Sequence, residues 1–177
     1  GTSWQGFASL EYQPVNVYAA TKNAFENILF YYSQSLGLRV VTLRLFDTYG
    51  PNDPRQKIIQ MLTGSAKSGV ELNLSPGEQR LNLVHIKDVV QCFISAYKWI
   101  NIQDPSTNNI FGVYDDIDYS LKEIASLIEN IIQRRLKVNF GFLPYREREV
   151  MKPAEGYSQL PGWYPTINLR DGLAELL

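Results

Sequence analysis

The 177-residue sequence has little of what several classes of protein require. It contains one cysteine, Cys92, and one histidine, His85. A lone cysteine excludes an intrachain disulfide, and two such residues are too few for a Cys/His zinc cluster. We therefore predict no metal site and a reducing compartment, the cytoplasm.

An excess of charge and long apolar runs are also missing. The chain has 17 Lys and Arg against 18 Asp and Glu, which leaves no basic stripe for a phosphate backbone and predicts no nucleic acid partner. The apolar stretch 40–46 is interrupted by Thr42 and Arg44 and is far shorter than the roughly 20 residues that cross a bilayer. No signal peptide opens the sequence, so we predict no membrane association. The 45% of hydrophobic residues instead predicts a folded core.

Helical and strand patterns alternate along the chain. The 16–36 helix is followed by Gly37 as a stop signal, and Ser120 with Glu123 forms a capping box at the start of another helix. A polar loop is expected over 47–54, directly after a nearly continuous apolar strand. The patterns predict an α/β fold, with helices at 16–36, 55–68, 87–100, 120–134 and 168–177 and strands at 38–46, 70–74, 79–85, 109–113 and 136–140.

Tyr18 and Lys22 are four residues apart, which places a phenol and an ammonium on the same face of the first helix. A cation held beside a phenol favours its ionised form and makes it useful for acid/base chemistry at neutral pH. The pair alone is weak evidence, because such spacing also occurs by chance on exposed helices. Tyr18 is a candidate to relay a proton to a sugar or alcohol oxygen.

Four segments in order strengthen this interpretation. They are Pro-Val-Asn-Val-Tyr-Ala-Ala-Thr-Lys at 14–22, Arg-Leu-Phe-Asp-Thr-Tyr-Gly-Pro at 44–51, the stretch 77–90, and the tail at 145–165 with its Gly-Trp-Tyr-Pro. With these segments the sequence resembles the extended short-chain dehydrogenase/reductase family, specifically its NAD-dependent nucleotide-sugar epimerases, dehydratases and reductases. The resemblance covers nearly the whole chain.

The resemblance implies the C-terminal part of a Rossmann-like, doubly wound parallel sheet and a smaller α/β substrate-binding region. Residues 1–69 would belong to the dinucleotide-binding domain and 70–177 mainly to the substrate region. No glycine-rich turn for a dinucleotide pyrophosphate is present in the sequence. We therefore expect a C-terminal portion with little activity by itself. The family's mode of assembly implies a homodimer through the 16–36 helix, with Phe25 or Leu29 at the interface.

The resemblance also implies roles for single residues. Tyr18 would be the acid/base and Lys22 a donor to the nicotinamide ribose of NAD or NADP, with Leu45 beside the cofactor. The family's active-site hydroxyl falls on Thr2 or Ser3, which could equally be an ordinary turn at the chain's start. The substrate, a nucleotide-diphosphate sugar, would be bound by Asp47, Arg80 and Arg146.

Alternatives stay open for several of these residues. Asp47 stands where the family has Asn, so it is either a turn residue, a ligand of a sugar hydroxyl, or a partner of Arg55. Arg80 lies one place out of register and could be a solvated turn residue; Arg146 has a similar alternative. Outside the site we expect Arg44 to pair with a carboxylate, His85 to bond locally before its helix, and Cys92 to be in the core.

Three reactions share the family's hydride transfer: epimerisation, dehydration and ketone reduction of a nucleotide-linked sugar. Dehydration needs proton carriers, and the resembling dehydratases place carboxylates directly after their active-site Thr. Ser3, Trp4 and Gln5 follow Thr2 here, which disfavours a dehydratase. An epimerase or 4-ketoreductase of deoxysugar biosynthesis remains, with a CDP-linked sugar as the nearest resemblance. The alternative is a non-catalytic fragment or scaffold protein.

Overall fold

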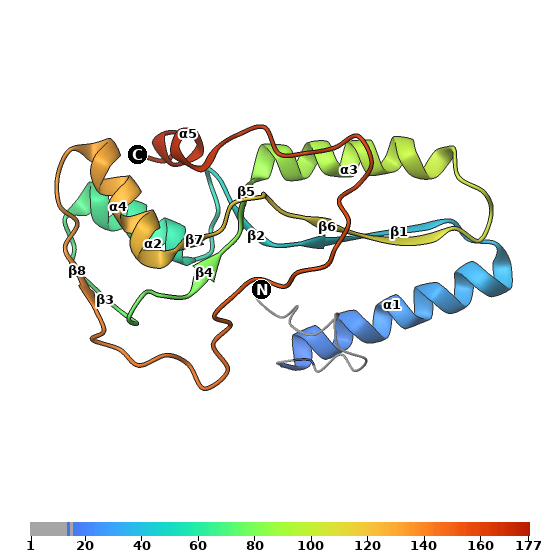
Figure 1. Ribbon diagram of the computed structural model, residues 1–177, viewed down its shortest axis with the longest axis horizontal. Coiled ribbons are helices and arrows are strands. Elements are labelled where there is room, and N and C mark those ends of the chain that lie inside the picture. The colour runs from blue at the N-terminus through green and yellow to red at the C-terminus, as the bar shows by residue number, and fades with distance from the viewer. Residues whose placement is uncertain (1–13, 15) are drawn as a thin grey trace.

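The computed structural model describes residues 14 and 16–177 of the chain. Helices and strands alternate through most of this length (Figure 1). The helices are α1 (Val17–Leu36), α2 (Ile58–Ser68), α3 (Ile86–Asn101), α4 (Leu121–Ile132) and α5 (Leu169–Ala174). The strands are β1 (Val40–Leu45), β2 (Asp47–Tyr49), β3 (Leu72–Leu74), β4 (Arg80–Leu81), β5 (Leu83–His85), β6 (Asn108–Val113), β7 (Tyr119–Ser120) and β8 (Val138–Phe140).

The longest strands, β1 and β6, form a parallel pair between two helices. Val40 lies opposite Asn108 and Leu45 opposite Val113. Figure 1 shows α3 on one face of this pair and α1 on the other. Such cover suits the apolar sequence of β1, whereas β6 is buried only over its last three residues, Phe111 to Val113. The α/β prediction is thereby confirmed.

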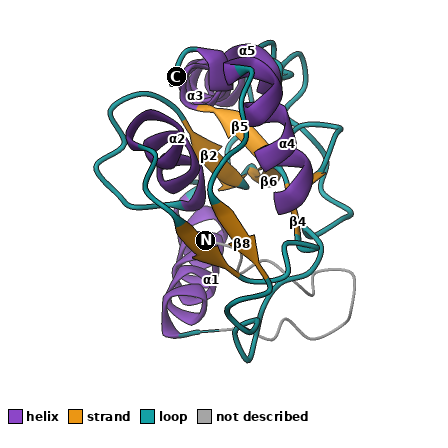
Figure 2. Ribbon diagram, turned by 90° about the vertical axis from the view of Figure 1, so that its left-hand side faces the viewer, coloured by secondary structure: helices purple, strands orange, loops and turns teal. Residues whose placement is uncertain are grey.

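Shorter strand pairs continue toward the other end of the molecule. β2 pairs with β5 and β3 with β8, both parallel, whereas β4 and β7 are antiparallel. Figure 2 looks onto this end, where α2, α4 and α5 gather. The boundary at residue 69 stays a prediction, and the β1–β6 pairing joins residues on both sides of it.

Two apolar clusters make up the core. The larger lies among α2, α4, α5 and the short strands, and includes Leu62, Leu121, Ile124, Ile128 and Leu173, each 2% exposed or less. The smaller lies between α3 and the β1–β6 pair; its members include Val84, Cys92, Val113, Leu160 and Trp163. Cys92 is thus a core residue, as predicted.

Local capping explains where the helices begin and end. The Asn16 side chain accepts a hydrogen bond from the Ala19 N–H at 2.9 Å, and α1 ends at Gly37, whose φ of 67° suits glycine. Ser120 and Glu123 form the predicted capping box of α4. These signals lie within a few residues of the helix ends, so the sequence alone predicts them.

Four short strands differ from the sequence expectations. The predicted loop 47–54 is wrong at its start, because Asp47–Tyr49 forms β2 on β5. The predicted strand 79–85 is interrupted at Asn82, which separates β4 from β5. β7 is not predicted at all, because the sequence pattern begins a helix at Ser120. Each strand exists through pairing with a distant segment, which local composition does not encode.

The second helix also begins later than expected, at Ile58 instead of Arg55. Asp53 accepts a hydrogen bond from the Arg55 N–H at 3.0 Å, and this turn keeps residues 53–55 out of the helix. Among the described residues, no helix is both long and apolar enough to span a bilayer.

Candidate functional site

Tyr18 and Lys22 lie one turn apart near the start of α1. The Lys22 Nζ stands over the Tyr18 ring, 5.4 Å from its centroid. Tyr18 is 58% exposed and Lys22 is exposed, so both polar ends reach solvent. The phenol and the ammonium are therefore available to a bound molecule.

A buried ion pair fixes this helix against the sheet. Glu26, one further turn along α1, binds the guanidinium of Arg44 in β1, with Nε at 3.0 Å from Oε1. Arg44 also donates to the Tyr157 hydroxyl at 3.0 Å, and its guanidinium carbon lies 5.3 Å from the centroid of that ring. Ser33, seven residues after Glu26 and on the same face, donates to the Ser106 carbonyl at 3.0 Å. The expected pairing of Arg44 with a carboxylate is confirmed.

The carboxyl end of β1 is Leu45, and Phe46 and Asp47 follow it directly. Phe46 lines a cavity of about 220 Å³ together with Asn82, residues 114–118 except 117, and residues 153–157. Leu45 is partly buried and packs against the smaller core cluster. Ligands of parallel α/β sheets bind beyond the carboxyl ends of the strands, which is where this cavity lies.

Asp47 is partly buried. Its burial raises the pKa of the carboxyl above the ordinary value, while the charge of Lys57 acts in the opposite direction. The suggested pairing with Arg55 is wrong, because Arg55 binds Asp53 with two hydrogen bonds of 2.8 Å. Burial therefore disfavours the charged form of the Asp47 carboxyl.

Asn82 organises the loop that forms another wall of the cavity. Its side-chain amide donates to the Asp115 carbonyl at 2.6 Å and to the Asp118 carboxylate at 2.7 Å, and its oxygen accepts from the Asp115 N–H at 2.8 Å. Three hydrogen bonds from one 4%-exposed side chain hold this loop in a single arrangement.

The two candidate diphosphate ligands come from segments in contact. The Arg80 N–H donates to the Met151 carbonyl at 3.0 Å, and the Tyr145 hydroxyl accepts from the Glu78 N–H at 3.0 Å. Arg146 is exposed on this second segment. The Arg80 guanidinium instead binds the Asp118 carbonyl and lies 3.5 Å from Glu123.

The remaining residues considered in the sequence are Thr2, Ser3, His85 and Cys92. Thr2 and Ser3 lie outside the described residues. His85 precedes α3 and its Nδ1 accepts a hydrogen bond from the Lys87 N–H, as expected. Burial raises the pKa of the Cys92 thiol to about 12, which leaves it protonated and unreactive.

Sequence reasoning missed Glu26, Asn82 and Tyr157. Glu26 had a usable signal, since it continues the four-residue spacing of Tyr18 and Lys22. Asn82 breaks an apolar strand, which indicates a polar role. Tyr157 lies in an irregular segment, and only the tertiary fold brings it to Arg44.

Parallel strand pairs covered by helices on both faces, with a tyrosine and a lysine on the helix that precedes β1, define a Rossmann-like α/β protein. Residues 5–110 match the model of the NAD dependent epimerase/dehydratase family, and the chain belongs to this family.

Its relatives include CDP-abequose synthase of Yersinia pseudotuberculosis, which is 34% identical over 146 residues, 82% of this chain and 50% of the relative. The crystal structure of UDP-glucose 4-epimerase of Thermotoga maritima with UDP-glucose has a TM-score of 0.80 at 23% identity and covers 93% of this chain and 53% of its own. UDP-glucuronic acid 4-epimerase of Bacillus cereus with NAD has a TM-score of 0.80 at 20% identity, over 98% and 56% of the two chains. The chain thus spans about half the length of the proteins it matches.

Proposed function

We propose that this chain is the C-terminal portion of an NAD(P)-dependent nucleotide-sugar 4-ketoreductase or epimerase of deoxysugar biosynthesis, in which Tyr18 is the acid/base. The family membership supports an enzyme acting on nucleotide sugars. The observation that carries the proposal is the Lys22 ammonium over the exposed Tyr18 phenol. The CDP-linked product named in the 34% identical relative supports a CDP-linked sugar as substrate.

The described residues fit the nicotinamide-ribose end of a dinucleotide. An exposed ammonium on α1 is a suitable donor to ribose hydroxyls, and the apolar Leu45 side chain at the end of β1 suits a ring face. When bound, a reduced nicotinamide supplies the hydride that the carbonyl carbon of a ketosugar accepts. Lys22 and Leu45 would hold that end of the cofactor.

In this proposal Tyr18 completes the reduction. The phenol gives its proton to the carbonyl oxygen, so that the ketone becomes an alcohol and the tyrosine becomes a phenolate. The positive charge of Lys22 stabilises the phenolate, because opposite charges a few ångströms apart favour the ionised form. In the reverse direction the phenolate takes the proton back, which an epimerase needs for its first oxidation step.

Arg146 is the stronger of the two candidates for the diphosphate. An exposed guanidinium fork matches phosphate oxygens and is always charged. Arg80 is engaged by Asp118 and Glu123 and would have to exchange those partners. Asp47 can accept a hydrogen bond from a sugar hydroxyl.

The proposal is tested by kinetics on the whole protein that contains this chain, with a nucleotide-linked 4-ketosugar and reduced nicotinamide. Tyr18→Phe removes the proton carrier and keeps the ring, so turnover should fall by about 10²- to 10⁴-fold with little change in sugar-nucleotide affinity. Lys22→Ala should lower turnover and also weaken cofactor binding. Tyr31→Phe, another exposed tyrosine on the same helix, is the matched control and should leave both unchanged.

Near-normal turnover of Tyr18→Phe would show that another group carries the proton. Loss of activity in the Tyr31→Phe control would show that the helix tolerates no change, and the role assigned to Tyr18 would lose its support. A wild-type protein that binds the nucleotide sugar without converting it would favour the non-catalytic alternative.

A further inference from the structure

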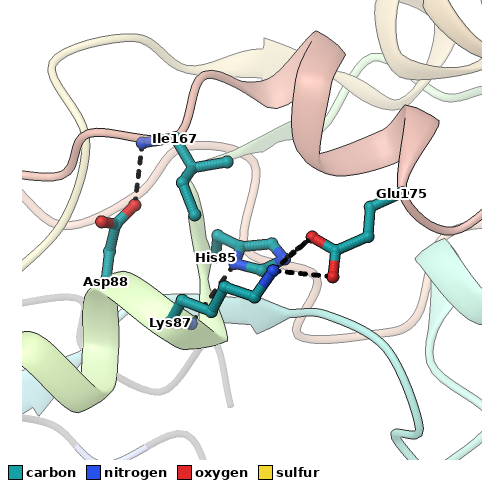
Figure 3. Close-up of polar contacts among 5 residues, drawn as sticks. All are labelled: His85, Lys87, Asp88, Ile167 and Glu175. Carbon is teal, nitrogen blue, oxygen red and sulfur yellow. Dashed lines mark hydrogen bonds and ion pairs between the residues drawn. The ribbon is translucent and has the colours of Figure 1, made fainter.

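His85 is the only histidine of the chain, and its side chain is completely buried. It lies at the junction of β5 and α3, with its ring against Tyr49 of β2 in an edge-on contact of 5.2 Å between centroids. Glu175, the residue after α5, places Oε2 3.5 Å from the His85 Nε2. Figure 3 shows His85 and Glu175 between α5 and the start of α3.

The hydrogen bond at Nδ1 determines the form of the imidazole. The Lys87 N–H donates to Nδ1 at 3.3 Å and caps α3, so Nδ1 carries no proton. The single proton of the neutral ring then lies on Nε2, which faces Glu175. Among the described residues Nε2 has no hydrogen-bond partner, and the Glu175 carboxylate lies 3.5 Å from it.

Lys87 completes the link between the helices. Its Nζ donates to both carboxylate oxygens of Glu175, at 2.8 and 2.9 Å (Figure 3). Asp88 is occupied separately, since its carboxylate accepts from Thr166 Oγ1 at 2.8 Å and from the Ile167 N–H at 3.0 Å. The C-terminal segment is therefore fastened to the first turn of α3 at two points.

The same carboxylate lines a cavity of about 280 Å³. Residues Gly50 to Asp53, which follow β2, form the opposite wall, and Lys67 of α2 is also part of the lining. The position of Glu175 therefore connects α5 with the loop that follows Asp47 and Tyr49.

We propose that His85, Lys87 and Glu175 form a pH-sensitive fastening that holds α5 on α3 only while His85 is neutral. Protonation at Nδ1 would place a donor opposite the Lys87 N–H and remove the cap of α3. It would also place a positive charge in a fully buried site near the Lys87 ammonium, a cost that the Glu175 carboxylate, 3.5 Å from Nε2, offsets only in part. Release of α5 would then open one wall of the cavity next to the loop after β2.

The groups around His85 shift its pKa in both directions. Burial lowers the pKa of His85 most, and Lys87 lowers it further, whereas Glu175 and Asp88 raise it. Tyr49 contributes a neutral phenol from β2. Because the folded pKa lies below the unfolded value of 6.5, the stabilisation is complete above pH 6.5 and is lost as the pH falls through the folded value. The lowered pKa of Glu175 acts below its ordinary value of 4.5, in a separate pH range.

Nuclear magnetic resonance of the His85 imidazole nitrogens tests the proposal in the whole protein that contains this chain, with the His85 signals assigned by their absence from the His85→Asn variant. We expect the Nε2–H form at pH 7.5 and a titration midpoint below 6.5. Amide exchange of α5, corrected for intrinsic rates, should accelerate by up to about tenfold for each pH unit as the pH falls from 6.5 to that midpoint, and should level off below it. An Nδ1–H form, or an ordinary midpoint near 6.5, would overturn the proposal.

Two variants separate the fastening from general acid unfolding. His85→Asn keeps a side-chain acceptor for the cap but has no titrating ring, so exchange of α5 should become independent of pH between 5 and 7.5. Glu175→Gln should accelerate the amide exchange of α5 at pH 5 and at pH 7.5. Glu147→Gln, at an exposed position, is the matched control and should have no effect. Acid-accelerated exchange that persists in His85→Asn would refute the proposal; should that variant not fold, the wild-type tautomer and midpoint still decide.

Discussion

Arg44 is 1% exposed in a strand of otherwise mainly apolar and β-branched residues. A buried guanidinium costs several kcal/mol unless its charge and its N–H groups are satisfied. Glu26 provides the opposite charge and Tyr157 a further acceptor, from a helix and from an irregular segment respectively. One residue of β1 thus fixes both the helix that carries Tyr18 and the segment that lines the cavity beyond β1.

We expect Glu26→Gln to lower the free energy of unfolding by about 3 kcal/mol, because it leaves Arg44 buried without an opposite charge. Urea unfolding followed by circular dichroism measures the change. Glu155→Gln removes an exposed carboxylate and serves as the control, with an expected effect below about 0.5 kcal/mol. Equal losses in the two variants would mean that the pair is not a principal attachment of α1.

Residue-level prediction succeeded where the partners are close in sequence. The spacing of Tyr18 and Lys22 placed them on one helix face, and the structure brings them together. The partners of Arg80 were not predictable, because Asp118 and Glu123 lie about 40 positions away and meet it only through the β4–β7 pairing. Long-range pairing carries information that no local pattern contains.

At the scale of elements, α2 shows two opposite uses of glycine. Gly64 lies within the helix, and a Cβ there would meet nothing within 4 Å. Gly69 ends the helix with a φ of 71°, and a Cβ there would likewise meet nothing. The two positions differ in backbone conformation alone.

Alanine at these positions should therefore change stability in opposite directions. Gly64→Ala should raise the free energy of unfolding by about 0.5–1 kcal/mol, since it restricts the unfolded chain and favours the helix. Gly69→Ala should lower it by about 1–2 kcal/mol through left-handed strain. The midpoints of urea unfolding report both changes, and a shift of the same sign for the pair would contradict the argument.

The helices were predicted closely, and the short strands were not. Helix ends are marked by caps such as Asn16 and Ser120, which act within three residues. β2 has turn-forming composition and becomes a strand because Asp47–Tyr49 aligns with β5, over 30 residues later. Elements of three residues depend on their partners more than on their own propensity.

At the scale of the whole molecule, exposed apolar side chains gather on two helices, which lie on opposite faces of the β1–β6 pair (Figure 1). On α3 the group includes Val90, Phe93, Ile94 and Tyr97, and on α1 it includes Phe25, Ile28, Phe30, Tyr31 and Tyr32. Apolar patches of this kind are uncommon on monomers and mark surfaces that another protein segment covers. We name the exposed apolar side chains of α1 the α1 face and those of α3 the α3 face.

The predicted homodimer uses the α1 face. Phe25 is 56% exposed and Leu29, one turn further, is partly buried, so Phe25 is the better of the two predicted interface residues. Phe25→Glu should weaken dimerisation by about a hundredfold or more, because a charge would be buried in an apolar contact. Analytical ultracentrifugation of the whole protein measures the dissociation constant. Tyr97→Glu changes a more exposed aromatic residue, on α3; it is the control and should leave the dimer intact. A dimer lost with Tyr97→Glu but kept with Phe25→Glu would move the interface to the opposite face of the sheet, and a wild-type monomer would refute the prediction.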